Sequence, residues 1–273
     1  MHSGDPGQVR PNDLVEVTNR EGRGRVVLVC DHASNHLPPE YGTLGLDSSE
    51  LTRHIAWDPG ALPVSLLLSK LLDAPLIAAG LSRLLIDCNR PIDAPDLIPE
   101  ISETTVIPGN VALGHEARHT RIELSHAPFH AAVEDVVTDR LRRGVTTWLL
   151  SVHSFTPVYK GVERPWHIGI LHDADERLSQ PMIADLARLD GVTVGDNQPY
   201  SPADRVYYTL ERHGRTRGLP CAMIEIRNDQ IADAAGQELW ARRIADVISG
   251  IEEPEIQTGT ETALHTKGRR HRA

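Results

Sequence analysis

The sequence has few cysteines, no long apolar run and no surplus of basic residues. Its three cysteines include no pair spaced by two residues, which argues against a disulfide framework. The most apolar stretch, residues 63–81, is interrupted by Lys70, Asp73 and Pro75, so it does not read as a membrane span. The stretch MHSGDPGQVRPND lacks the apolar core of a signal peptide. We therefore expect a soluble, cytoplasmic protein that binds no membrane.

Acidic residues outnumber basic ones, and histidine is unusually frequent. The 38 Asp and Glu against 28 Lys and Arg give a formal net charge of −10, which disfavours a general nucleic-acid-binding surface. Fourteen histidines stand in a chain of 273 residues. Because histidine serves as metal ligand, acid or base, this count favours a metal or catalytic site without locating it.

Short apolar runs alternate along the chain with segments of helical spacing. The segments that read as buried strands are 25–30, 75–81, 82–88, 146–153, 167–171, 192–196 and 219–227. The segments that read as helices are 59–73, 115–143 (interrupted at Pro128), 176–190 and 237–251. This alternation predicts an α/β fold, a single-domain three-layer sandwich around a largely parallel, twisted mixed sheet. We expect a flexible lead-in over 1–24, the folded domain over 25–252 and a disordered tail over 253–273.

Polar side chains follow several predicted strands at the point where each strand ends. These residues are Asp31 and His32, then Asp87, Asn89 and Arg90, then His153 and Ser154, and finally Glu225, Arg227 and Asn228. In open α/β sheets the ligand lies at the carboxyl ends of the strands. The sequence therefore predicts that two histidines, a glutamate and an arginine meet at one edge of the sheet.

Such a set of side chains suits metal-assisted hydrolysis. Two neutral imidazoles and one carboxylate bind Zn²⁺ and leave a position for water, whose pKa the metal lowers. Glu225 lies in an apolar strand, where burial would raise its pKa to a value useful for proton transfer. The alternatives are structural: hydrogen-bonded histidines, and ion pairs between Glu225 and Arg227 or between Asp87 and Arg90.

A second histidine motif competes with this site. The segment HEARH at 115–119 matches the H-E-x-x-H zinc pattern, with Glu116 as the base. Its polar surroundings are typical of a solvated helix face, so we favour the strand-end site. The two hypotheses make different predictions. If HEARH binds the metal, His119→Ala loses it; if the strand-end site binds the metal, His153→Ala loses it.

Seven blocks in order along the chain carry a family resemblance. They are CDHASNHLP, RHIAWDPGA, SRLLIDCNRP, SVHSFTP, RPWHIGIL, VGDNQPYS and IEIRND, which span about Val26 to Ile231. Together they resemble the N-formylglutamate amidohydrolase family, which is similar in fold to the zinc carboxypeptidases and aspartoacylases. The resemblance implies a metal-dependent amidohydrolase of amino acid catabolism. Its expected substrate is a small carboxylate-bearing N-acyl amino acid, N-formyl-L-glutamate, cleaved to formate and glutamate.

The resemblance also implies a metal site. His32 and His153 would bind Zn²⁺ or another divalent metal, with Glu225 as the general base. For the third ligand we choose Asp58, although this residue could instead cap a helix. The related peptidases have an acid at the position of Asn35, and His36 is a further alternative ligand.

The expected substrate contacts lie at the same strand ends and in polar loops. Asn89 and Arg90 would hold a substrate carboxylate, and Arg83 would hold a second one or pair with Asp87. Other candidates for substrate binding are Arg164, His167, Asn197 and Arg227. Two other functions stay open, a zinc peptidase or other N-acyl amino acid deacylase, and a non-catalytic carboxylate-binding protein on the same scaffold.

Overall fold

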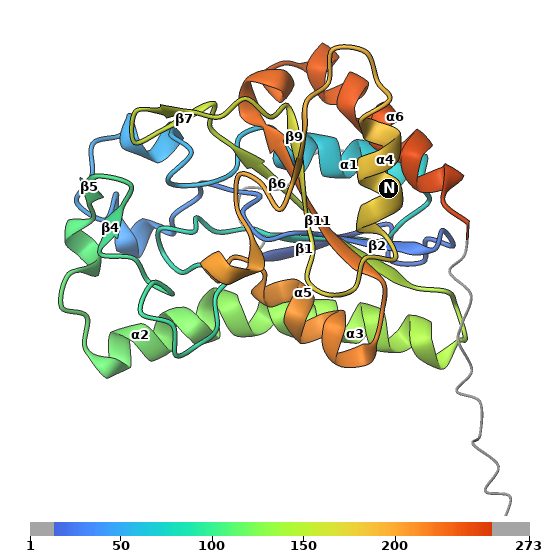
Figure 1. Ribbon diagram of the computed structural model, residues 1–273. Coiled ribbons are helices and arrows are strands. Elements are labelled where there is room, and N and C mark those ends of the chain that lie inside the picture. Colours follow the sequence, from blue (N-terminus) through green and yellow to red (C-terminus); the bar gives the residue numbers. More distant parts are fainter. Residues whose placement is uncertain (1–13, 253–273) are drawn as a thin grey trace, which may run out of the picture.

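A seven-stranded sheet forms the centre of the computed structural model, which describes residues 14–252 (Figure 1). In spatial order the strands are β1 (Val15–Thr18), β3 (Leu76–Ala79), β2 (Val26–Cys30), β6 (Trp148–Phe155), β11 (Cys221–Arg227), β9 (Ile168–Leu171) and β10 (Val194–Asp196). Strands β3, β2, β6 and β11 are parallel neighbours, as are β9 and β10, whereas β1 and β9 run antiparallel to β3 and β11. The predicted mixed and largely parallel sheet is confirmed.

Helices cover both faces of this sheet and complete the three layers. On one face lie α1 (Ala61–Leu71), α4 (Ser179–Leu186) and α6 (Ala234–Gly250), and on the other lie α3 (Ala127–Arg142) and α5 (Tyr208–His213) (Figure 1). Strand β2 shows why both faces must be covered. Val26, Leu28 and Cys30 enter the core on the first face, while Val27 and Val29 enter the core on the second.

The long helix expected over 115–143 is interrupted close to the predicted place. It consists of α2 (His115–Arg121), a π-helical turn (Ile122–His126) and α3, with Pro128 in the first turn of α3. Proline has no N–H to donate and its ring crowds the carbonyl four residues earlier. The wider π turn directly before it accommodates this crowding.

Segment 82–88 is not a strand, contrary to the prediction. The chain leaves the sheet after β3 and turns, with the amide of Leu85 donating to the carbonyl of Ser82 at 2.9 Å. Leu84, Leu85 and Ile86 are buried in two smaller apolar clusters away from the main sheet. The apolar run reflected burial under loops rather than pairing in a sheet.

The lead-in expected over 1–24 was also wrong in part, because it contains β1. This edge strand pairs with β3 in antiparallel register, Val15 opposite Ala79, and its residues are only half-buried. The part of that prediction over 1–13 and the tail predicted over 253–273 lie outside the described residues.

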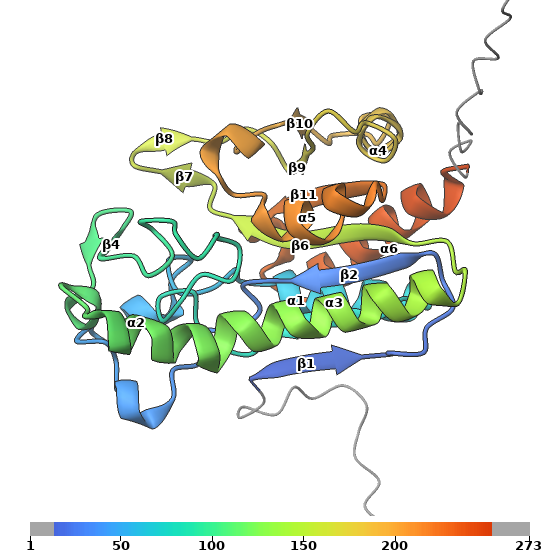
Figure 2. The same cartoon turned by 90° about the horizontal axis from the view of Figure 1, so that it is seen from below.

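Two short hairpins lie at the end of the molecule toward which β2 and β6 run (Figure 2). They are β4 (Ile101–Ser102) with β5 (Thr105–Val106), and β7 (Val158–Tyr159) with β8 (Val162–Glu163). The carboxylate of Glu103 accepts a hydrogen bond from the amide of Lys160 at 3.4 Å and so links the two hairpins. Among the helices of residues 14–252, none has the length and apolar character needed to cross a bilayer.

Candidate metal and catalytic site

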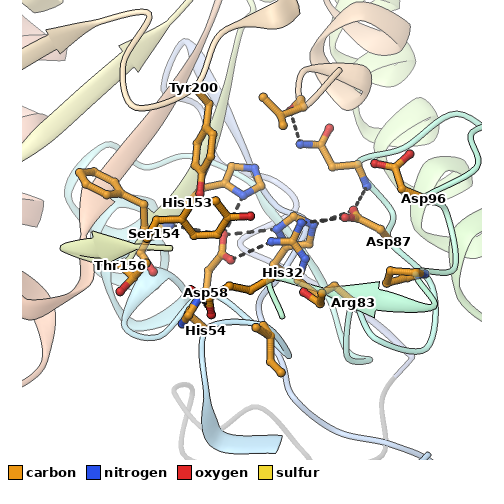
Figure 3. Close-up of a pocket in the computed structure, with 18 of the residues that line it drawn as sticks. His32, His54, Asp58, Arg83, Asp87, Asp96, His153, Ser154, Thr156 and Tyr200 are labelled. Carbon is orange, nitrogen blue, oxygen red and sulfur yellow. Dashed lines mark hydrogen bonds and ion pairs between the residues drawn. The ribbon is translucent and has the colours of Figure 1, made fainter. Parts of the chain in front are cut away.

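Two histidines and an aspartate converge at the carboxyl ends of β2 and β6 (Figure 3). His32 lies two residues after the end of β2, His153 lies on β6, and Asp58 precedes α1. One carboxylate oxygen of Asp58, Oδ2, lies 2.8 Å from Nδ1 of His153 and 3.3 Å from Nδ1 of His32. All three side chains are buried, and within residues 14–252 they are the only His, Cys, Asp and Glu side chains grouped closely enough to hold a metal.

The turn before α1 fixes the position of Asp58. Its amide donates to the carbonyl of His32 at 3.0 Å, which ties the turn to the end of β2. Gly60 has a φ of +82°, and a Cβ at this residue would lie 2.5 Å from the carbonyl oxygen of Ile231. Glycine is therefore required here. No side chain caps α1, so the alternative role of Asp58 as a helix cap is not observed.

The outer nitrogen of each imidazole faces a second carboxylate. Nε2 of His32 lies 2.7 Å from Asp87 Oδ1. Nε2 of His153 lies 3.2 Å from Asp31 Oδ2 and 2.7 Å from the hydroxyl of Ser151, which itself donates to Asp31. Carboxylates in this position orient metal-binding histidines and raise their basicity. Sequence analysis placed Asp31 and Asp87 at strand ends but gave them no role in the site, although the DH pair at 31–32 was a visible signal.

These acids also control the charge of the histidines. Burial opposes a charge on His153, but its hydrogen bonds to Asp31 and Asp58 outweigh burial and raise its pKa well above the ordinary value. For His32, burial and the charge of Arg83 lower the pKa, but Asp87 and Asp58 outweigh them. The pKa of His32 is therefore raised above its ordinary value. A divalent cation bound between Asp58 and the two Nδ1 atoms would displace any proton held there.

Glu225 lies beside this group on β11. It is paired in register with His153 across the parallel β6–β11 pair and is only 5% exposed. Its Oε2 atom is buried and has no hydrogen-bond partner among the described residues. Burial first, and then the charge of Asp58, raises the pKa of Glu225 to about 7. A carboxyl group with this pKa can accept and return a proton near neutral pH.

A cavity of about 260 Å³ opens over these residues. Its wall includes His32, Asp58, His153 and Glu225, together with His54, Arg83, Asp87, Asn89, Arg90, Asp96, Tyr159 and Tyr200. The two hairpins contribute Ile101, Ser102, Glu103 and Tyr159 to its rim. This volume suits a small molecule.

Both cavity arginines are paired with acids. Arg83 Nη2 lies 2.8 Å from Asp87 Oδ2, and its Nη1 lies 3.5 Å from Asp58 Oδ1. The predicted alternative, an ion pair between Arg83 and Asp87, is therefore present. Arg90 Nε lies 2.7 Å from Asp96, whose side chain is half exposed. A substrate carboxylate that pairs with Nε of Arg90 would displace that acid.

The amide of Asn89 is used within the protein. Its nitrogen donates to the carbonyl of Val206 at 2.5 Å, and its oxygen accepts from the amide of Thr209 at 3.0 Å. Asn89, which also lines the cavity, therefore joins the turn that carries Arg90 to the beginning of α5.

The four other predicted substrate contacts do not line the cavity. Arg164 donates to the hydroxyl of Tyr200, and His167 accepts from the amide of Thr193. Asn197 accepts from the amide of His172, and Arg227 pairs with Asp229. The structure thus brings together the metal group, Glu225, Arg83, Asn89 and Arg90, but not these four.

The competing metal candidates lie elsewhere. His115, Glu116 and His119 are exposed on α2 and belong to no group of potential ligands. The side-chain amide of Asn35 donates to the carbonyl of Leu51 at 2.8 Å. Neither Asn35 nor His36 joins the metal group, and neither lines the cavity.

Comparison with known proteins adds a family and a fold. Residues 24–232 match the family model described as N-formylglutamate amidohydrolase. A crystal structure of a gene product from Agrobacterium tumefaciens is 43% identical, with a TM-score of 0.85 over 88% of this chain and 94% of that one. The N-formylglutamate amidohydrolase from Ralstonia eutropha JMP134 is 18% identical, with a TM-score of 0.63 over 85% of this chain and 94% of that one. A comparison with curated proteins gives no match.

Proposed function

The chain belongs to the N-formylglutamate amidohydrolase family, a family of amide hydrolases, and we propose that it hydrolyses N-formyl-L-glutamate to formate and glutamate. The observation that supports this proposal most directly is the position of Glu225, a buried carboxyl group with an unpaired oxygen beside the His32–Asp58–His153 group. A peptidase or another N-acyl amino acid deacylase would use the same group, so the acyl group is the part that experiment must decide.

The donor set fits Zn²⁺. Two imidazole nitrogens and one carboxylate oxygen meet in a buried site, and the outer nitrogen of each imidazole faces a carboxylate. A divalent cation bound by His32, Asp58 and His153 would lower the pKa of water and polarise the amide carbonyl.

Glu225 moves the proton. It accepts a proton from the water molecule whose oxygen attacks the carbonyl carbon. It then delivers that proton to the amide nitrogen as the C–N bond breaks, so that the amine leaves neutral. A pKa of about 7 suits a group that must perform both steps.

The carboxylates of the substrate are assigned to the arginines of the cavity. Arg90 is the better placed of the two, because its partner Asp96 is half exposed and can yield to a substrate carboxylate. Arg83 is held by two buried acids and adds positive potential near the reaction centre. Bidentate pairing with guanidinium is the common way in which proteins orient a carboxylate.

The test is formate release from N-formyl-L-glutamate by the zinc-loaded protein, with a chelator-treated sample beside it. We expect release that stops on chelation and returns on adding zinc. Release that continues after full metal removal would contradict the metal assignment. No release from a protein with bound zinc would contradict the substrate and direct the search to other N-acyl amino acids.

A further inference from the structure

Tyr200 is a cavity residue that sequence analysis did not identify. It lies in the loop between β10 and α5, and its ring extends toward the metal group so that the hydroxyl lies at the end nearest His153 (Figure 3). Nη1 of Arg164 donates a hydrogen bond to this hydroxyl at 3.0 Å.

Arg164 is an unusual partner, because it is a buried cation without an acid. It is 8% exposed, and no carboxylate of residues 14–252 lies within ion-pair distance of it. Its guanidinium carbon lies 4.7 Å from the centre of the Tyr200 ring and 4.5 Å from that of Tyr159. Two aromatic faces thus hold the guanidinium and partly compensate its charge. A buried positive charge of this kind polarises the hydroxyl to which it donates.

The proton of the Tyr200 hydroxyl is available to a ligand. The hydroxyl accepts from Arg164, and within the described residues no acceptor takes its own proton. Burial first, and then the charge of nearby Glu225, raises the pKa of Tyr200, so the group stays a neutral donor. The donor therefore lies on the cavity wall, near the proposed base.

We propose that Tyr200 is a further catalytic residue, whose hydroxyl donates a hydrogen bond to the carbonyl oxygen of the scissile amide as negative charge develops there. This inference rests on the proposed amide hydrolysis. When the water oxygen forms its bond to the carbonyl carbon, the π electron pair moves to the carbonyl oxygen. Tyr200 keeps its proton and shares it in a hydrogen bond, and the C–N bond then breaks as the pair returns. Such donors act mainly on the transition state.

Arg164 is a positioning residue in this scheme. It does not line the cavity, and its hydrogen bond to a cavity side chain is the one to the hydroxyl of Tyr200, so we expect it to act through that hydroxyl. Loss of either side chain should therefore remove the same contribution. In the Tyr200→Phe background, Arg164→Met should cause no further fall in kcat, whereas two independent roles would give additive losses.

The first measurement is the steady-state kinetics of metal-loaded Tyr200→Phe. We expect kcat to fall on the order of 10²-fold with KM changed less than about twofold. Tyr41→Phe is the matched control, because Tyr41 packs in a separate apolar cluster outside the cavity and its variant should keep the wild-type kcat. An unchanged kcat, or a raised KM at constant kcat, would overturn the assignment of Tyr200.

A binding measurement separates this inference from the proposed substrate. A phosphonate analogue of N-formyl-L-glutamate places charged oxygens around a tetrahedral centre, whereas glutamate does not. By calorimetry, Tyr200→Phe should bind the phosphonate at least about tenfold more weakly and glutamate with unchanged affinity. Equal affinities of wild type and variant for the phosphonate would overturn the Tyr200 assignment even if formate is released. If Tyr200→Phe binds the phosphonate more weakly as expected but the wild type releases no formate, only the proposed substrate is contradicted.

Discussion

Glu225 and His153 lie side by side on two parallel strands, in register across the β6–β11 pair. The sheet itself therefore sets the relation between the proposed base and a proposed metal ligand. Both residues are buried at the carboxyl edge, and neither depends on a loop for its position. A site built on central strands holds its geometry more closely than one built on loops.

Replacing the base should separate metal binding from turnover. Glu225→Gln keeps the size of the side chain but removes the group that accepts the proton, so we expect kcat to fall on the order of 10³-fold or more. The variant should bind one metal per chain as the wild type does, because Glu225 is not a member of the metal group. Metal content and formate release check this, and substantial remaining turnover would exclude Glu225 as the base.

The two histidine motifs make opposite predictions for metal content. His153→Ala should lose the metal, because it removes one of three converging ligands. His119→Ala should keep it, because His119 is exposed on α2. Metal analysis after dialysis against a weak chelator gives the answer. Loss of metal from His119→Ala alone would assign the site to HEARH instead.

The carboxylate behind His32 should tune metal affinity without binding the metal. Asp87→Asn weakens the contact to Nε2 of His32, which lies 2.7 Å from the carboxylate, and we expect metal affinity to fall about 10- to 100-fold. Asp93→Asn is the matched control, since Asp93 is exposed close by in the sequence and should leave the affinity unchanged. Equal affinities for Asp87→Asn and wild type, measured by competition with a chromophoric chelator, would contradict the role.

The fold was predictable where a strand is buried on both faces. Strands β2, β6 and β11 have uninterrupted or nearly uninterrupted burial, and their apolar runs are long enough to identify. His32, His153 and Glu225 could be found for the same reason, because each lies in or directly after such a run. The apolar run at 82–88 wrongly predicted a strand, because burial under loops gives the same sequence pattern as burial in a sheet.

The rest of the site depends on contacts between segments that only the fold defines. Asp31 faces His153 because β2 and β6 pair in a particular register, Val29 opposite Ser151. Tyr200 enters the cavity from a loop, and its role depends on a hydrogen bond from Arg164, 36 residues earlier. Neither relation leaves a periodic signal in the sequence.

Three buried histidines beneath the Asn89–Arg90 turn should make the protein sensitive to acid. Nε2 of His130 lies 2.9 Å from the carbonyl oxygen of Cys88, and its Nδ1 lies 2.9 Å from Nε2 of His213. Nε2 of His126 lies 2.9 Å from the carbonyl oxygen of Arg90. Burial lowers the pKa of all three and brings that of His213 to about 4. In the unfolded chain the value returns to about 6.5.

These pKa values determine how the free energy of unfolding changes with pH. Below pH 6.5 the unfolded chain binds protons that the folded His213 does not bind, so the free energy of unfolding falls as the pH falls toward 4. Between pH 6.5 and pH 5 this loss amounts to about 1.6 kcal/mol for one histidine, because the unfolded imidazole is already half protonated at pH 6.5. His213→Gln keeps a donor for His130 but cannot titrate, so its free energy of unfolding should fall by about 1.6 kcal/mol less than that of the wild type over this interval. His115→Gln, which removes an exposed histidine, should follow the wild type. Urea unfolding at the two pH values measures this, and parallel losses in His213→Gln and wild type would show that His213 is not the group that titrates.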